Sequence, residues 1–427
     1  MSPRTDTSLW HPFADMAAIR DREFVLSRGE GVWLFDEAGK RYLDGSASLW
    51  YCNIGHGRTE IADAVAEQMK RLEAWSIFGN YATPPALELA DALAERSSLD
   101  GAKIFLTSGG GDAIDTAAKL ARMYWQVFGQ PDRLHIVSRT NAYHGTMAFG
   151  TSIGGIEAVR TGYGPLVPST SQVEWDSPEA LAEEIERIGP ERVAAFFFEP
   201  VIGAGGVFPP PPGYIERTAE ICRDAGVLFV CDSVICGFGR LGTWFGYERF
   251  GVEPDLVTFA KGVTSGYLPL GGVVVSGQVA EPFWSEPGRV TIRHGQTYAG
   301  HASVCTAALA NIEIMEREGL ISRGREREDE LLEALAPLAD HPLIGEVRGG
   351  TGLIAGIALD PAALAADPAL TSKASASIRD HGGVILRALA QALAVSPPLT
   401  ISSDEIRLIH DGVRAGLDAL VESGVPA

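Results

Sequence analysis

One lysine of this sequence occupies a position where a reactive amine is expected. Lys261 directly follows the apolar run DLVTFA and precedes a glycine, unlike the other lysines of the chain. Burial in an apolar setting disfavours the charged ammonium and lowers the pKa of a lysine, which makes the amine a nucleophile or a base. The alternative is a lysine whose stem lies along a strand end while its ammonium stays in water. We take Lys261 as the candidate catalytic residue.

An aspartate ends a second apolar run. Asp232 closes the stretch GVLFVCD, and a carboxylate there needs a cationic partner because burial of an unpaired charge is costly. The protonated ring nitrogen of a heteroaromatic cofactor is one such partner. A salt bridge to Arg240, or the capping of a following helix, is an alternative that the residues leave open.

Three consecutive glycines, 109–111, separate another apolar run from a helix-like stretch. Glycine lets backbone N–H groups approach a phosphate closely, and the N-terminus of the helix favours the anion. The loop does not fit the G-x-G-x-x-G pattern of dinucleotide-binding proteins, because Ile114 occupies the place of the last glycine. An NAD-dependent oxidoreductase is therefore disfavoured, and it would also leave Lys261 unexplained.

The elements that carry these residues alternate along the chain. Short runs that are apolar throughout are typical of strands buried on both faces of a parallel sheet. Helix-like stretches over 112–128 and 211–226 lie between such runs, so the alternation predicts an α/β core from about residue 60 to 320. The runs and their turns span residues 103–111, 134–145, 192–200, 226–234 and 255–262, and LGGVVVSG follows the last.

Ligands of open α/β sheets bind beyond the carboxyl ends of the strands. The glycine loop, Tyr143, Glu199, Asp232 and Lys261 all come directly after an apolar run, so we expect them to converge on one crevice. A phosphate cradle, a stacking aromatic ring, an aspartate and a lysine together match the parts of a pyridoxal-phosphate site.

Composition narrows the class of protein further. The formal net charge of −20 argues against nucleic acid or an anionic membrane as partner. No apolar run is long enough to span a bilayer, and the N-terminal MSPRTDTSLWHPF lacks the apolar segment of an export signal. The five cysteines form no C-x-x-C pair, so we expect neither a disulfide framework nor a metal site. We expect a cytoplasmic protein.

Longer motifs carry a resemblance over nearly the whole chain. They are WHPFADM, LDGSASLWYCNIGHGR, FLTSGGGDAIDTAAKLAR, NAYHG, FFEPVIGAGG, CDSVICGFGRLG, TFAKGVTSGYLPLGG, HGQTYAGHASVCTAALA and GVILRALAQALAVSPPL. In their order and spacing they resemble the class III aminotransferases, specifically the ω-amino-acid:pyruvate group. The resemblance implies pyridoxal-phosphate fold type I (aspartate-aminotransferase-like), with a mainly parallel sheet in a large domain and a smaller α+β domain. It divides the chain into an N-terminal segment of the small domain (1–59), a cofactor-binding domain (60–320) and a C-terminal small domain (321–427).

The resemblance also implies roles for single residues. Lys261 would carry pyridoxal 5'-phosphate as a Schiff base (aldimine), and a homodimer would share its active sites, with a tetramer left open. The expected cofactor contacts are Gly110 and Gly111 with the phosphate, Tyr143 and Val234 with the two ring faces, Asp232 with the ring nitrogen, Glu199 near the ring hydroxyl, and Thr297 with the phosphate in the neighbouring subunit. The expected substrate contacts are Trp50, Arg387 as a clamp for a carboxylate, and Phe78 from the partner chain.

The implied reaction moves an amino group from an ω-amino acid or amine to a keto acid, with pyruvate as the expected acceptor. The sequence leaves the donor open among β-alanine, a diamine and an aryl amine. A racemase or aminomutase on the same scaffold would share the early chemistry, although Arg387 favours transamination because a keto-acid acceptor needs a carboxylate clamp. An inactive binding protein is disfavoured, because binding alone does not require Lys261.

Three departures from the family pattern bear on these expectations. Gly111 replaces a serine of the phosphate loop, so one phosphate-binding hydroxyl is missing. Ser233 replaces a glutamate beside Asp232 and removes a negative charge. Ala390 and Gln391 replace the usual glycine and polar residue after Arg387, which puts the movement of that arginine, and hence the choice of donor, in doubt.

Overall fold

The apolar runs form a seven-stranded sheet with the order β4-β10-β9-β8-β7-β5-β6. The computed structural model describes residues 8–19, 23–286, 288 and 290–424. Strands β7 to β10 are buried along their whole length, which explains why their sequences are apolar without alternation. The strands are β4 (Lys103–Thr107), β5 (His135–Arg139), β6 (Thr170–Val173), β7 (Val193–Phe198), β8 (Leu228–Asp232), β9 (Leu256–Phe259) and β10 (Gly271–Val275).

Strands β5 to β9 are parallel, as expected for a mainly parallel sheet. Strand β10 differs, because it pairs antiparallel with both β4 and β9. No helix long enough for a crossover lies between β9 and β10, where the chain makes only the short turn η3 (Lys261–Val263). A parallel return requires a longer connection, so the strand runs back beside its predecessor.

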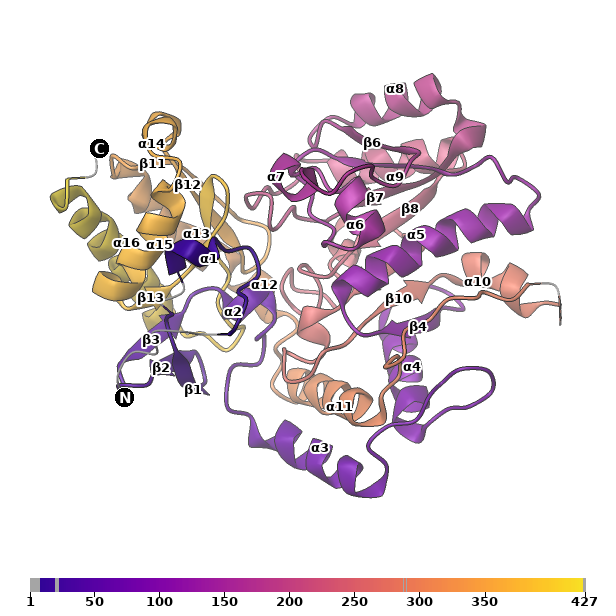
Figure 1. Cartoon of the computed structure of the whole chain (residues 1–427), viewed down its shortest axis with the longest axis horizontal. Coiled ribbons are helices and arrows are strands. Elements are labelled where there is room, and N and C mark those ends of the chain that lie inside the picture. The colour runs from indigo at the N-terminus through magenta and orange to yellow at the C-terminus, as the bar shows by residue number, and fades with distance from the viewer. Residues whose placement is uncertain (1–7, 20–22, 287, 289, 425–427) are drawn as a thin grey trace.

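Helices cover the sheet on both faces (Figure 1). The expected helix at 112–128 is α5, which presents Ala113, Ala117 and Ala121 to apolar side chains of the sheet and begins at Gly110. The second expected helix, at 211–226, begins only after its prolines. The helices in the first 320 residues are α1 (Met16–Ile19), α2 (Ala47–Trp50), α3 (Thr59–Arg71), α4 (Pro84–Arg96), α5 (Gly110–Val127), α6 (Ala148–Ile153), α7 (Glu157–Arg160), α8 (Pro178–Ile188), α9 (Tyr214–Asp224), α10 (Gly277–Trp284) and α11 (Ala302–Arg317).

The two ends of the chain meet in one small sheet of order β1-β2-β3-β13. The hairpin expected between Gly31 and Asp44 is present, and its second strand pairs in parallel with β13, as Val384 pairs with Leu43. This pairing supports the division at about residues 59 and 320, which we propose for the domains. The elements are β1 (Leu26–Glu30), β2 (Trp33–Asp36), β3 (Arg41–Asp44), α12 (Arg323–Glu326), α13 (Glu328–Leu335), β11 (Ile344–Arg348), β12 (Ala355–Leu359), α14 (Pro361–Ala366), α15 (Leu370–Ser377), β13 (Val384–Ile385), β14 (Arg387–Ala388), β15 (Ala392–Val395) and α16 (Ser403–Glu422).

The first and last described helices, α1 and α16, lie on the side of the molecule away from the large sheet (Figure 1). A second small sheet, of order β11-β12-β15-β14, completes this part and carries Arg387 on its edge strand. Within the described ranges, no helix is long and apolar enough to cross a membrane. Residues 1–7, on which the expectation of no export signal partly depends, lie outside those ranges.

Candidate active site

A cavity of about 270 Å³ lies beyond the carboxyl ends of the parallel strands. This is the edge of the sheet where the sequence places the strand-end residues. The cavity brings together seven of the residues that the sequence singled out: Gly110, Gly111, Tyr143, Glu199, Asp232, Val234 and Lys261.

Asp232, at the end of β8, is buried and held by three donors. Oδ1 accepts hydrogen bonds from the backbone N–H of Val234 at 3.0 Å and from Oγ1 of Thr258 at 3.1 Å. Oδ2 lies 2.8 Å from Nδ1 of His144. Arg240, the alternative partner considered above, donates elsewhere, to Asn53 and to the carbonyl groups of Leu353 and Pro397.

His144 is a functional candidate that the sequence reasoning did not assign. It follows Tyr143 in the loop after β5, so the signal was its place at a strand end. Its imidazole is fully buried, and Nε2 has no hydrogen-bond partner in the described part of the chain. The ring therefore joins the loop after β5 to the end of β8 and fixes the direction of the Asp232 carboxylate.

Lys261 starts the short turn η3 directly after β9. Its backbone has φ 48°, a left-handed value that costs a non-glycine residue energy and changes the direction of the chain sharply. Burial lowers the pKa of its amine, although the carboxylates of Asp232 and Glu199 act in the opposite direction. The site thus favours the neutral amine that nucleophilic and base chemistry requires.

Glu199, at the end of β7, is tied to the loop that carries Tyr143. Its Oε1 accepts from the backbone N–H of Tyr143 and its Oε2 from that of Gly203, both at 3.0 Å. Burial raises the pKa of this carboxyl, with a further contribution from Asp232, while His144 lowers it. The carboxyl group therefore fixes where the aromatic ring lies at the cavity wall.

The glycines leave room for an anion at the N-terminus of α5. A Cβ on Gly110 would lie 2.9 Å from Cγ1 of Val234, and one on Gly111 would lie 3.1 Å from Cγ of Met147. A Cβ on Gly145, which has φ +89°, would lie 3.2 Å from Cα of Gly111. The free N–H groups of a helix start and the absence of side chains suit a phosphate. With Lys261, the Asp232–His144 pair and Tyr143 on the same cavity, the residues fit pyridoxal phosphate.

Trp50 and Arg387 lie beside this group. Nζ of Lys261 is 5.8 Å from the centre of the Trp50 ring, and the guanidinium carbon of Arg387 is 5.6 Å from it. Nε of Arg387 is buried and makes no hydrogen bond within the described residues. An unpaired guanidinium near a reactive amine is suited to bind a carboxylate.

The family model Aminotransferase class-III matches residues 16–416. The chain belongs to the class-III aminotransferases. It is 42% identical to a thermostable (S)-enantioselective ω-transaminase from Thermomicrobium roseum, with a TM-score of 0.91 and 96% of each chain covered. It is 35% identical to an amine transaminase from an uncultivated Pseudomonas species, solved in its PLP-bound form, with a TM-score of 0.91, 97% of this chain and 99% of that chain covered. It is 37% identical over 429 residues to putrescine–pyruvate aminotransferase from Pseudomonas aeruginosa, covering 95% of this chain and 93% of the relative.

Class-III aminotransferases use pyridoxal phosphate, and the protein is a PLP-dependent transaminase of fold type I. The family, the fold, the cofactor and the type of reaction predicted from the sequence are thereby confirmed. The relatives are transaminases, which favours that reaction over racemisation, aminomutation or hydride transfer.

Four predicted site residues of this transaminase do not line the cavity of Lys261. Trp50 and Arg387 lie beside it, as described above, whereas Phe78 and Thr297 have no such contact within the described part of the chain. Phe78 and Thr297 are exposed. Phe78 lines a second cavity of about 700 Å³, together with Gly295 and Ala299, which flank Thr297 in the sequence. Both residues were expected to act in the site of a neighbouring subunit, and their placement outward on this chain is compatible with that expectation.

The departures of this aminotransferase have local explanations. The hydroxyl of Ser233 donates to the carbonyl of Phe245 and lies 3.2 Å from Sγ of Cys231. It therefore stabilises the chain after β8 and does not line the cavity. Ala390 and Gln391 lie in the tight turn between β14 and β15, closed by the N–H of Leu389 on the carbonyl of Ala392 at 2.8 Å. Arg387 is therefore anchored on a strand, and any movement must come from its side chain.

Proposed function

We propose that this transaminase takes its amino group from a primary amine or an ω-amino acid and passes it to a 2-keto acid, with pyruvate as the acceptor. The observation that carries the proposal is Arg387, whose guanidinium has no ion-pair partner among the described residues and lies, like the amine of Lys261, within 6 Å of the centre of the Trp50 ring. A keto acid would place its carboxylate on Arg387 and its carbonyl toward Lys261. The acceptor named for the P. aeruginosa relative is pyruvate.

The cofactor, when bound, supplies a carbonyl that reacts with amines and a ring that withdraws electrons. We propose that Lys261 binds it covalently and that the N–H groups of Gly110 and Gly111 hold the phosphate. The remaining contacts follow from the cavity walls. Tyr143 and Val234 would lie on the two faces of the ring, Asp232 at the ring nitrogen and Glu199 near the ring hydroxyl.

Residues of the chain then have separate roles in proton transfer and in substrate binding. The neutral amine of Lys261 takes a proton from the donor carbon that bears the amino group and returns a proton to the acceptor. Asp232, oriented by His144, stabilises a proton on the ring nitrogen. Arg387 orients the acceptor, and Trp50 limits the size of the donor. The donor leaves as an aldehyde or ketone, and the keto acid leaves as an amino acid.

We also propose a homodimer in which Phe78 and Thr297 complete the site of the partner subunit. Neither residue lines the cavity of Lys261 in its own chain, which supports this proposal. The exposure of their sequence neighbours Trp75 and Tyr298 also supports it. A Thr297→Ala chain and a Lys261→Ala chain should each be inactive or impaired alone. Mixed dimers of the two should regain activity if the sites are shared, and no gain on mixing would contradict sharing.

The test of the proposed function is multiple turnover of an amine with pyruvate, followed by the formation of alanine. Lys261→Ala should abolish it, whereas Lys373→Ala, at an exposed lysine paired with Asp367, should not. Reduction of the holoenzyme with borohydride and peptide mass spectrometry should place the cofactor mass on Lys261. Cofactor on another lysine, or sustained turnover by Lys261→Ala, would overturn the assignment.

A further inference from the structure

The loop that carries Trp50 has a backbone that its residues do not favour. Ala47, Ser48 and Trp50 all have positive φ, at 45°, 59° and 60°, although none of them is glycine. Non-glycine residues keep such values only where surrounding contacts impose them. Something outside the loop must therefore hold it.

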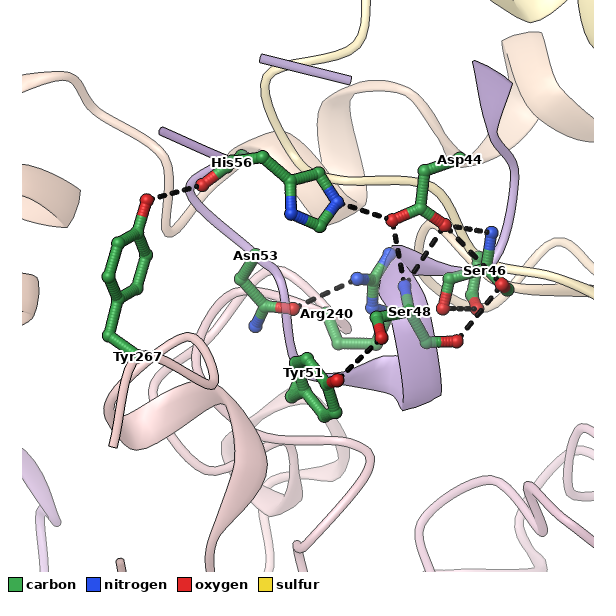
Figure 2. Close-up of polar contacts among 10 residues, drawn as sticks. Asp44, Ser46, Ser48, Tyr51, Asn53, His56, Arg240 and Tyr267 are labelled. Carbon is green, nitrogen blue, oxygen red and sulfur yellow. Dashed lines mark hydrogen bonds and ion pairs between the residues drawn. The ribbon is translucent and has the colours of Figure 1, made fainter. Parts of the chain in front are cut away.

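The carboxylate of Asp44 makes those contacts (Figure 2). The N–H of Ser48 donates to both of its oxygens, at 3.0 and 2.8 Å, and the N–H of Ser46 donates to Oδ1 at 3.1 Å. On the other side, Nε2 of His56 lies 2.8 Å from Oδ2. Asp44 is fully buried, so these contacts take the place of water for a charged group.

The same point also anchors β13, the short strand that directly precedes the strand of Arg387. Asp44 ends β3 and pairs with Ile385, two residues before Arg387. Gly45 next to it donates to the carbonyl of Ile385 at 3.0 Å and accepts from the N–H of Ser396 at 2.7 Å. The loop of Trp50 and the strand of Arg387, which form two walls around Lys261, therefore start from one anchor.

Further contacts bind the loop to the turn of Lys261. The side-chain amide of Asn53 donates to the carbonyl of Phe238 at 2.8 Å, and a Cβ on Gly262 would lie 2.6 Å from that amide nitrogen. The hydroxyl of Ser48 lies 2.6 Å from that of Tyr51, whose ring packs on Gly266. The apex of the loop, at Ser48, is held by Asp44 through its N–H and by the hydroxyl of Ser46, which donates to its carbonyl at 3.0 Å. Of these two side chains, Asp44 is the one that is also held from outside the loop, by His56.

We propose that Asp44, held in turn by His56, is the positioning residue that places Trp50 over Lys261 and thereby sets which amines the transaminase accepts. The inference rests on the proposed role of Trp50 in the donor pocket. Asp44 touches neither substrate nor cofactor, and it acts through the backbone of Ser48.

The test uses the holoenzyme labelled with 5-fluorotryptophan, in which the ¹⁹F resonance of Trp50 is assigned by its loss in Trp50→Phe. Asp44→Asn keeps the shape but replaces one acceptor oxygen by a donor, so it should shift or broaden that resonance. Asp36→Asn is the matched control, because Asp36 makes similar backbone contacts in the turn between β2 and β3, away from the cavity. An unchanged Trp50 resonance in folded Asp44→Asn would overturn the proposal.

The functional readout is the ratio of kcat/KM for 1-phenylpropylamine to that for putrescine, with pyruvate as acceptor. Asp44→Asn should change this ratio by about tenfold, the equivalent of one hydrogen bond to a charged group, while Asp36→Asn leaves it unchanged. If the wild-type enzyme turns over neither amine, the proposed function fails while the ¹⁹F comparison still decides the role of Asp44.

A rescue variant separates positioning from general loss of structure. Adding Ser48→Gly to Asp44→Asn gives the loop a residue that adopts φ 59° without strain, and it should restore the Trp50 resonance and the donor ratio in part. Ser48→Ala loses the same hydroxyl without gaining that freedom, so it should restore neither. Equal behaviour of the two double variants would contradict the proposal. If Asp44→Asn does not fold, His56→Gln, which weakens the hold on the same carboxylate, is measured in its place.

Discussion

Nδ1 of His144 lies 2.8 Å from Oδ2 of Asp232, and the two residues are 88 positions apart in the chain. The contact joins the loop that carries Tyr143 to the strand that ends in Asp232. Among the described residues, the carboxylate is oriented by this side chain, by Thr258 and by the N–H of Val234. The histidine is the contact on Oδ2, so it decides how the carboxylate faces the cavity.

Removal of that imidazole should loosen the cofactor and slow the chemistry. His144→Ala leaves Oδ2 of Asp232 without its partner, and loss of one hydrogen bond to a charged group should weaken PLP binding and the amine half-reaction by about tenfold. His144→Asn, which can still donate to Asp232, should retain more of both. The measurements are PLP dissociation by dialysis and single-turnover absorbance. His135→Ala, at a partly buried histidine bonded to Ser171, is the control and should match the wild type.

Arg387→Gln should lower activity toward the keto acid much more than activity toward the amine. The guanidinium offers charge and two parallel donors to a carboxylate, so its loss should lower kcat/KM for pyruvate by tenfold or more, or about 1.5 to 3 kcal/mol. An amine that carries no carboxylate makes no such pair, so kcat/KM for that amine should fall much less. Steady-state kinetics with each substrate varied measures the two effects. Arg379→Gln, at an arginine paired with Asp380 on the surface, should change neither, and equal losses for both substrates would argue against a carboxylate clamp.

Much of the site could be predicted because each residue has a local signal. Lys261, Asp232 and Glu199 each end an apolar run, and the rule that ligands bind beyond strand ends brings them together without knowledge of the register. The glycine loop before α5 was readable for the same reason. The direction of β10 was harder to predict. A parallel and an antiparallel strand can have the same apolar pattern, so the residues of β10 themselves do not show which way it runs.

Contacts between segments far apart in the chain could not be predicted from the sequence. The pairing of His144 with Asp232, and of Asp44 with His56, depends on how loops pack after the strands are placed. The loop before Trp50 contains Ala47 and Ser48 where positive φ would lead one to expect glycine, so its shape has no sequence signal. Phe78 and Thr297 are exposed and do not line the cavity of Lys261, so their expected role in a neighbouring subunit could not be checked within one chain.

Gly111→Ser tests why the phosphate loop lacks its hydroxyl. A Cβ at this position would lie 3.1 Å from Cγ of Met147, so the serine alone should bring little gain. With Met147→Ala added, the hydroxyl has room, and PLP should bind about fivefold more tightly than to Met147→Ala alone, the equivalent of about 1 kcal/mol. Gly111→Ala with Met147→Ala adds the Cβ without the hydroxyl and should show no gain. Dissociation constants for PLP decide between these outcomes.

Asp255 should make the stability of the protein depend on pH. It accepts a hydrogen bond from the N–H of Phe229 at 2.8 Å just before β9, and burial raises its pKa from 3.8 to about 6. A raised pKa means that the folded state favours the protonated carboxyl. The stability that this group contributes is therefore present at low pH and is lost as the pH rises through about 6.

Asp255→Asn removes the ionisation and should stabilise the protein relative to wild type by an amount that grows with pH. From the raised pKa, the difference should increase by about 1 kcal/mol between pH 5 and pH 8 and stay level above that. Thermal unfolding of the holoenzyme at matched PLP and protein concentrations across this range measures it. Asp63→Asn, at an exposed aspartate on α3, is the control for the substitution itself. A constant offset for Asp255→Asn would mean that the carboxyl titrates alike in the folded and unfolded chains, and that the hydrogen bond from Phe229 compensates for its burial.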